Sequence, residues 1–284
     1  MSEAEARFDL GDYRVVIATA FGPRLLAFDH RLGRGPLVRL DDRVALDGGP
    51  DGPYRMRGGH RLWAAPELPE VTYATDDEPC EVVEEPGGVT VGGPTDAAGL
   101  RKTIRLRAAE DAVVVEHELS NAGPSAARVA AWAITQVRLG GIAMCPLLGN
   151  GNGGLQADRS LVLWPYTDPS DQRITYRPDG VSIEAAPGPA LKLGAGPRPG
   201  ALGYLLDGRL FTKTVAGEQP DAEYPDRGAV GQIYLNERFC ELESVGPLTD
   251  LGPGESITHT EVWQLQPCED PDTAHRLVIA EARR

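Results

Sequence analysis

The chain has 284 residues, 41% of them hydrophobic, so it can bury a sizeable core and is not a disordered polypeptide. It carries 42 acidic against 28 basic residues, and this net charge of −14 argues against a nucleic-acid partner or an anionic membrane surface. The sequence has no apolar run of transmembrane length, no secretion signal at its acidic N-terminus, and only four widely spaced cysteines. We therefore expect a soluble, cytoplasmic protein, with its oligomeric state left open.

Short segments in which apolar and polar residues alternate recur along the chain, as expected for β-strands. In chain order they cover residues 15–18, 24–28, 81–91, 103–107, 112–119, 128–137, 160–164, 174–183, 201–206, 210–215, 230–243 and 256–265. Turn sequences such as Leu-Gly-Pro-Gly-Glu at 251–255 separate them. A dozen strands without intervening helices predict an antiparallel all-β fold, either a large sandwich or a barrel.

The remaining segments are expected to be loops, apart from a short C-terminal helix over residues 273–284. Residues 185–200 are rich in Gly, Pro and Ala and are expected to form a surface loop. The glycines at 150–154 are expected to form turns, because no helix follows that would complete a phosphate-binding loop. No linker interrupts the pattern, so we expect a single domain over residues 1–284, with its core from about residue 14 to about residue 266.

Several segments resemble a known superfamily. Phe-Gly-Pro-Arg-Leu-Leu-Ala-Phe at 21–28, the strand at 113–121 that ends in Asn, and the turn at 251–255 resemble the galactose mutarotase-like (aldose 1-epimerase-like) superfamily. Gly-Gly-His-Arg-Leu-Trp-Ala-Ala-Pro-Glu at 58–67 and Cys-Glu-Leu-Glu-Ser-Val-Gly-Pro at 240–247 are similar to its bacterial DUF4380 branch. The resemblance implies a large antiparallel β-supersandwich that handles sugars.

The same resemblance implies a pair of catalytic residues, of which this sequence keeps one. Catalytic mutarotases carry a histidine acid on the strand after the central one, and Trp132 stands at the matching position here. Their base is a glutamate late in the chain, and Glu241 or Glu243 fills that place. The resemblance therefore supports the fold more strongly than it supports an activity.

Glu241 and Glu243 are two residues apart on an expected strand, so both side chains project from one face, about 6–7 Å apart at Cα. Two carboxyl groups on one face push each other's pKa values apart, which suits acid–base chemistry. Phe239 shares their face, whereas Cys240 and Leu242 lie opposite. This pattern favours a strand that lines a cavity over the alternative, the solvated face of an edge strand, and one of the two glutamates is the expected catalytic base.

Two residues are candidates for the acid. His60 follows a flexible glycine pair in a loop-like setting, and the usual pKa of an imidazole suits proton shuttling; the alternative is a loop-capping hydrogen bond. Lys213, one of only three lysines, lies on an expected strand and suggests a buried amine that faces Glu241 or Glu243. A solvent-facing lysine is the alternative there.

Further side chains are expected to hold the ligand. Arg61 would donate paired hydrogen bonds to vicinal hydroxyls or to a carboxylate, and Trp63 would stack on the C–H face of a sugar ring unless it is simply a core residue. The full set of expected binding residues is Arg61, Trp63, Gln136, Glu67, Trp132 and Trp164.

The sequence contains no metal-ligand motif and no dinucleotide fingerprint, so no metal or other cofactor is expected. A cation would be held only if the fold brought His60, Glu67 and the two glutamates together. A small molecule, either a sugar or a sugar-like compound, is the expected partner.

The sequence therefore predicts a mutarotase- or epimerase-like isomerase that carries out acid–base chemistry in a concave β-sheet pocket. A non-catalytic carbohydrate-binding or sensing protein is one alternative, because Trp132 replaces the acid. The same scaffold turned to a lyase, isomerase or cyclase step in secondary metabolism is another, since a fold does not fix a function.

Overall fold

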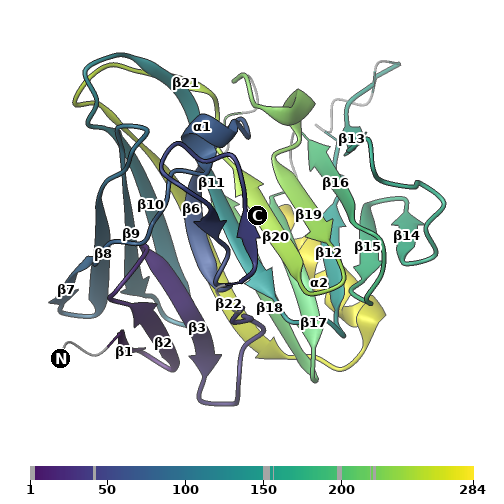
Figure 1. The fold of residues 1–284 in the computed structure, drawn as a ribbon. Helices are drawn as coiled ribbons and strands as arrows, with labels where there is room; N and C mark the ends of the chain where they lie inside the picture. The colour runs from purple at the N-terminus through teal and green to yellow at the C-terminus, as the bar shows by residue number, and fades with distance from the viewer. Residues whose placement is uncertain are drawn as a thin grey trace.

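Two ten-stranded antiparallel sheets lie face to face in the computed structural model and enclose one hydrophobic core (Figure 1). The structure describes residues 4–40, 43–149, 154–155, 157–196, 200–217, 219 and 222–284. The expected class, a large antiparallel all-β sandwich, is confirmed.

The two sheets can be followed in spatial order from one edge to the other. The first contains β1 (Glu5–Leu10), β2 (Tyr13–Ala18), β3 (Arg24–His30), β6 (His60–Ala65), β11 (Ala127–Val137), β20 (Cys240–Val245), β19 (Gly231–Leu235), β16 (Leu191–Gly196) and β13 (Ser160–Leu163), with β21 (Thr249–Leu251) paired to β11. The second contains β14 (Ile174–Arg177), β15 (Gly180–Glu184), β12 (Ile142–Pro146), β17 (Ala201–Leu206), β18 (Arg209–Ala216), β22 (Ser256–Pro267), β10 (Val113–Asn121), β9 (Leu100–Ala108), β8 (Gly88–Thr95) and β7 (Glu81–Glu85).

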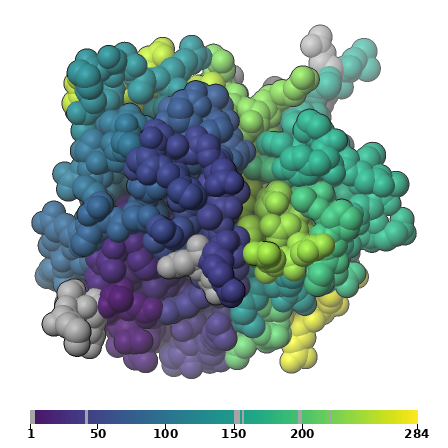
Figure 2. Space-filling model, viewed as in Figure 1, coloured from purple at the N-terminus to yellow at the C-terminus, as the bar shows by residue number. Residues whose placement is uncertain are grey.

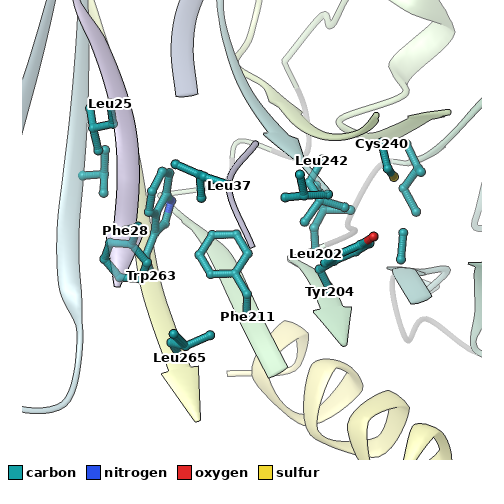
Figure 3. Packing of buried hydrophobic residues seen from close by; sticks show 14 of the residues in the cluster. Leu25, Phe28, Leu37, Leu202, Tyr204, Phe211, Cys240, Leu242, Trp263 and Leu265 are labelled. Atoms are coloured by element: carbon teal, nitrogen blue, oxygen red, sulfur yellow. The ribbon is translucent and has the colours of Figure 1, made fainter. Parts of the chain in front are cut away.

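Alternation along the strands places one face of each sheet in the core. In β10, Val113, Val115, His117 and Leu119 are buried, whereas the residues that alternate with them, Val114, Glu116 and Glu118, are partly exposed. At the centre of the core Phe28, Phe211 and Trp263 meet edge to face, with ring centroids between 5.2 and 5.8 Å apart (Figure 3). This geometry is favourable for aromatic rings and fixes the spacing of the two sheets.

The expected C-terminal helix is present as α2 (Pro271–Ala282), which begins two residues earlier than the periodicity predicts. Asp270 caps it by accepting a hydrogen bond from the backbone N–H of Thr273 at 2.8 Å. The helix covers β12 and β17 on the outer face of the second sheet (Figure 1). No helix in the described part of the chain is long and apolar enough to cross a lipid bilayer.

Three of the expected strands are each a hairpin, because a turn inside the alternating segment reverses the chain. Residues 81–91 form β7 and β8, residues 174–183 fall in β14 and β15, and residues 230–243 fall in β19 and β20. In the first of these Gly87 supplies the positive φ of 73° that the tight turn needs.

The larger error concerns residues 185–200, which were expected to form a surface loop. Leu191–Gly196 is instead the buried strand β16, between β19 and β13. Gly194 is required by close packing, since a Cβ there would lie 2.7 Å from that of Ala229. Residues 197–199 and most of the expected loop at 150–154 lie outside the described residues.

Four small elements complete the fold. β4 (Ala45–Leu46) and β5 (Tyr54–Arg55) form a two-stranded hairpin, α1 (Pro69–Thr72) is one turn long, and η1 (Asp226–Gly228) precedes β19. The hairpin and the chain after α1 lie on the outer face of the first sheet, over β6 and its neighbours (Figure 1).

Candidate active site

The outer face of the first sheet carries a row of polar side chains. Gln136 on β11 pairs with Glu241 on β20, Glu241 pairs with Tyr234 on β19, and Tyr234 pairs with Lys192 on β16. Residues directly opposite each other in an antiparallel sheet project to the same face. Glu241 and Lys192 therefore share this face from strands that are two positions apart, about 10 Å at Cα.

A pocket of about 500 Å³ lies over this row. Its floor is formed by strand residues that include Arg61, Trp63 and Trp132, and its walls come from the β4–β5 hairpin and from the loops after α1, β13 and β19. In Figure 2 the blue segment that carries the hairpin and the green segment of β19 and β20 meet on this face. Segments far apart in the sequence thus meet at one cavity.

Glu241 lines the pocket and is 6% exposed. Its Oε1 accepts a hydrogen bond from Arg61 at 3.1 Å, and the Arg61 guanidinium lies 4.0 Å above the ring of Trp63. The Nε and second terminal nitrogen of Arg61 are buried and have no hydrogen-bond partner among the described residues. Arg61 is thus held by one carboxylate and one aromatic ring, and two of its nitrogens have hydrogen-bond donors that are not used within the described residues.

Glu243 is fully buried beneath the pocket. Its Oε2 accepts hydrogen bonds from Lys192 Nζ at 2.7 Å and from Trp132 Nε1 at 2.8 Å, whereas Oε1 has no partner in the described residues. Burial raises the pKa of Glu243 to about 7, although the Lys192 ammonium lowers it. The Lys192 ammonium is itself held over the rings of Trp132 and Trp164, at 4.6 and 4.7 Å.

The structure does not bring His60 and Lys213 to this pocket. His60 begins strand β6 and is fully buried, so the expectation of a loop-like setting is wrong. Because Arg61 faces the pocket, its neighbour His60 faces the second sheet. Lys213 is the buried amine that was expected, but its carboxylate is Glu261 at 2.7 Å and neither Glu241 nor Glu243.

His60 and Lys213 belong instead to a chain of hydrogen bonds between the sheets. His117 Nδ1 lies 2.8 Å from the backbone oxygen of His259 and must donate to it. His117 Nε2 then accepts from His60 Nε2 at 2.7 Å, and His60 Nδ1 accepts from the Thr135 hydroxyl at 3.0 Å. Lys213 donates to the same hydroxyl oxygen at 3.2 Å. We call these residues, with Ser244 and Glu261, the interlayer network.

One group of side chains among the described residues has the spacing of a metal site. Ligand atoms of His60, His117 and Glu261 lie within 4.8 Å of one another. The hydrogen bonds of the interlayer network satisfy the same atoms, and the Lys213 ammonium already occupies the cation position beside Glu261. The alternative in which His60, Glu67 and the two glutamates converge on a cation does not occur, because His60 lies on the other face of its sheet.

The remaining expected binding residues are near the pocket, with one exception. Trp63, Glu67, Trp132 and Trp164 line it, and Glu67 accepts a hydrogen bond from Tyr73 at 2.5 Å. Gln136 lies on the same face but is fully buried and does not line the cavity, and both polar atoms of its amide lack a partner among the described residues.

Sequence reasoning missed Lys192 and Tyr234. Lys192 lies within the segment that was expected to be a loop, so its neighbours were never assigned to faces. The alternation Leu191-Lys192-Leu193 and the rarity of lysine in this arginine-rich chain were the available signals.

Comparison with known proteins gives the fold and nothing narrower. No model of a known protein family matches the sequence, and no curated protein does so either. A candidate aldose 1-epimerase from Klebsiella pneumoniae is 12% identical, with a TM-score of 0.58 over 95% of this chain and 80% of that one. A galactose mutarotase-like protein from Clostridium acetobutylicum is 9% identical, with a TM-score of 0.53 over 92% and 94%.

The same fold also occurs within longer proteins. This chain spans 46% of a TPR-domain containing protein from Parabacteroides distasonis, with 91% of its own length covered, 11% identity and a TM-score of 0.58. These structural similarities show that the fold is a galactose mutarotase-like sandwich. At such low sequence identity they do not test the resemblance to the DUF4380 branch, which stays a prediction.

Proposed function

We propose that the chain is an acid–base isomerase of mutarotase or epimerase type, acting on a sugar or sugar-like ligand. One observation carries the proposal: Glu241 and Lys192 line the same pocket, from strands separated by one other strand. A carboxylate and an ammonium about 10 Å apart at Cα can reach opposite sides of one pyranose ring. The galactose mutarotase-like fold supports a carbohydrate ligand.

The chemistry follows from those two groups. Glu241 would accept the proton of the anomeric hydroxyl while Lys192 donates a proton to the ring oxygen, so that the ring C–O bond breaks and a carbonyl forms. Closure on the other face of the carbonyl reverses both transfers. Glu243, directly beneath Lys192, would compensate the change in charge on that amine, because its pKa of about 7 lets it bind or release a proton near neutrality.

A second candidate function is a carbohydrate-binding protein without catalysis. The observation that favours it is Trp132, an indole that cannot transfer a proton, at the position where the superfamily resemblance implies an acid. In that reading Lys192 and Glu243 form a fixed ion pair that shapes the pocket.

An anomer-exchange assay over a panel of neutral aldoses separates the two candidates. We expect the wild type to accelerate exchange and Glu241→Gln to lower kcat by at least about 100-fold while Kd changes little, because the amide keeps the shape and loses the proton acceptor. Glu84→Gln, an exposed strand glutamate of the second sheet, is the matched control and should behave as wild type. Saturable binding with no acceleration over buffer would support the binding protein.

A further inference from the structure

Aromatic side chains are concentrated at the pocket. Three of the four tryptophans line it, namely Trp63, Trp132 and Trp164. Four more aromatic residues join them from the loops and from β19: Tyr73, Tyr166, Tyr234 and Phe239. One ring would be enough to stack against the C–H face of a sugar, so this lining exceeds what a simple sugar uses.

The charged side chains on the floor of the pocket are already paired with one another. Arg61 bonds Glu241, and Lys192 bonds Glu243. One wall is formed by aliphatic side chains of the hairpin region, Val44, Leu46 and Met56, which pack with Trp63, Trp132 and Phe239. Polar side chains from other loops, those of Glu67, Asn236 and Arg238, line the remaining wall. A sugar hydroxyl pressed against the aliphatic wall would lose water without gaining a hydrogen bond, and this costs free energy.

We infer that the ligand has two parts, a hydroxylated ring over the polar floor and a planar apolar substituent between the aromatic side chains of the wall. The inference rests on the proposed function and narrows its substrate class. A volume of about 500 Å³ falls within the range of about 300–1,000 Å³ that is typical of sites for larger organic ligands. Tyr166, 50% exposed, stands at the opening, where it would contact the end of the substituent.

The charges at the pocket indicate a neutral ligand. Arg61, Lys192 and Arg238 line it together with Glu67 and Glu241, and the carboxyl of Glu243 lies beneath. The basic and acidic groups nearly balance even when Glu243 takes up a proton, so little excess positive charge is present to hold a phosphate or a carboxylate. A sugar phosphate therefore belongs among the negative controls.

Calorimetric titration with matched ethers of one reducing sugar tests the inference. Glucose and galactose would each carry either a benzyl or a methyl ether at one hydroxyl away from the anomeric carbon, and the two ethers differ only in the phenyl ring. We expect the benzyl ether to bind at least tenfold more tightly than the methyl ether at one or more positions. Equal affinities at every position, or no binding of any benzyl ether, would overturn the inference.

Two tyrosines of equal exposure provide the variants. Tyr166→Ala should remove most of the advantage of the benzyl ether and leave the affinity for the methyl ether unchanged. Tyr176→Ala, on β14 and 49% exposed, lies outside the pocket lining and should leave both affinities as in the wild type. A benzyl advantage that persists in Tyr166→Ala would place the phenyl ring elsewhere and contradict the inference.

The failure of this inference and the failure of the proposed function give different results. Anomer exchange of the unsubstituted sugar with no preference for benzyl ethers would leave the isomerase proposal standing and remove the two-part ligand. Preferential binding of benzyl ethers without anomer exchange would leave the two-part ligand standing and remove the isomerase proposal.

Discussion

Two buried lysine–glutamate pairs of the same length lie on opposite sides of the first sheet. Lys213 and Glu261 meet at 2.7 Å between the sheets, and Lys192 and Glu243 meet at 2.7 Å beneath the pocket. The two pairs differ in what surrounds them, so they allow structural and chemical roles to be compared within one molecule.

The difference lies in hydrogen-bond satisfaction. Glu261 accepts hydrogen bonds from Lys213, Ser244 and Trp263. Burial alone would raise its pKa, but the adjacent Lys213 ammonium outweighs this effect and the pKa is lowered to about 2. Glu243 has one oxygen without a partner among the described residues, and burial raises its pKa to about 7. A complete set of partners makes a buried pair structural, whereas an incomplete set leaves a group that titrates near neutral pH.

The largest expected effect is acid unfolding through the interlayer network. Burial lowers the pKa of His60, His117 and His259, the last to about 3, whereas in the unfolded chain imidazoles titrate near their ordinary value of about 6.5. The unfolded state therefore binds more protons, and stability falls as pH drops from 6.5 toward 3. Glu243 opposes this change as a single group between pH 4.5 and 7.

Because the lowered imidazoles outnumber the one raised carboxyl, unfolding takes up protons overall, and each imidazole that stays neutral in the fold contributes a loss of up to about 1.4 kcal/mol per pH unit. Urea unfolding between pH 7 and pH 4.5 measures this slope. His259→Asn should make the slope shallower by up to one proton, and a flat profile in the wild type would contradict the assignment of three neutral imidazoles.

The next largest effect is expected from Lys213→Met. It leaves Glu261 buried without its cation, which should cost about 3–5 kcal/mol of unfolding free energy at pH 7. The double variant with Glu261→Leu should recover most of this loss, because no buried charge remains. A loss below about 1 kcal/mol in the single variant would mean that the interlayer network is not structural.

Lys192→Met should have the smallest effect on stability. Below pH 7 the carboxyl of Glu243 can take up a proton at little cost, so we expect a loss of about 1 kcal/mol or less at pH 6. Above pH 7 the loss should grow by up to about 1.4 kcal/mol per pH unit, as the wild type ionises and the variant does not. The double variant with Glu243→Gln should show no such growth, whereas a loss as large as that of Lys213→Met would erase the contrast between the pairs.

The fold was predictable because alternation is visible in the sequence of most strands. The prediction of strands failed where the composition resembled that of a loop. Gly194 and Gly196 lie within β16, where they allow close packing, and Gly58-Gly59 directly precedes the strand β6. Proline and glycine indicate the preferred conformation of the local backbone. Whether these segments are buried as strands depends on neighbouring strands from distant parts of the chain.

The same errors limited the prediction of the site. Alternation places Glu241 and Glu243 on one face, and the structure has both there. His60 and Arg61 were assigned to one site because residues 58–67 were not recognised as containing a strand, in which neighbours face opposite ways. Lys192 was overlooked because its strand, β16, was also not recognised. The register of β16 with β19 is what brings Lys192 to the pocket.

The titration of the two buried glutamates tests the account most directly, because it needs no knowledge of the ligand. Carbon-13 NMR of the side-chain carboxyl groups, with Glu243→Gln and Glu261→Gln to assign the signals, would follow both in one sample. We predict that Glu243 titrates near pH 7 and that Glu261 stays ionised down to the acid unfolding transition. If both titrated together near the usual value for glutamate, Glu243 could not compensate the charge on Lys192 near neutral pH, and the claimed contrast between the two pairs would be wrong.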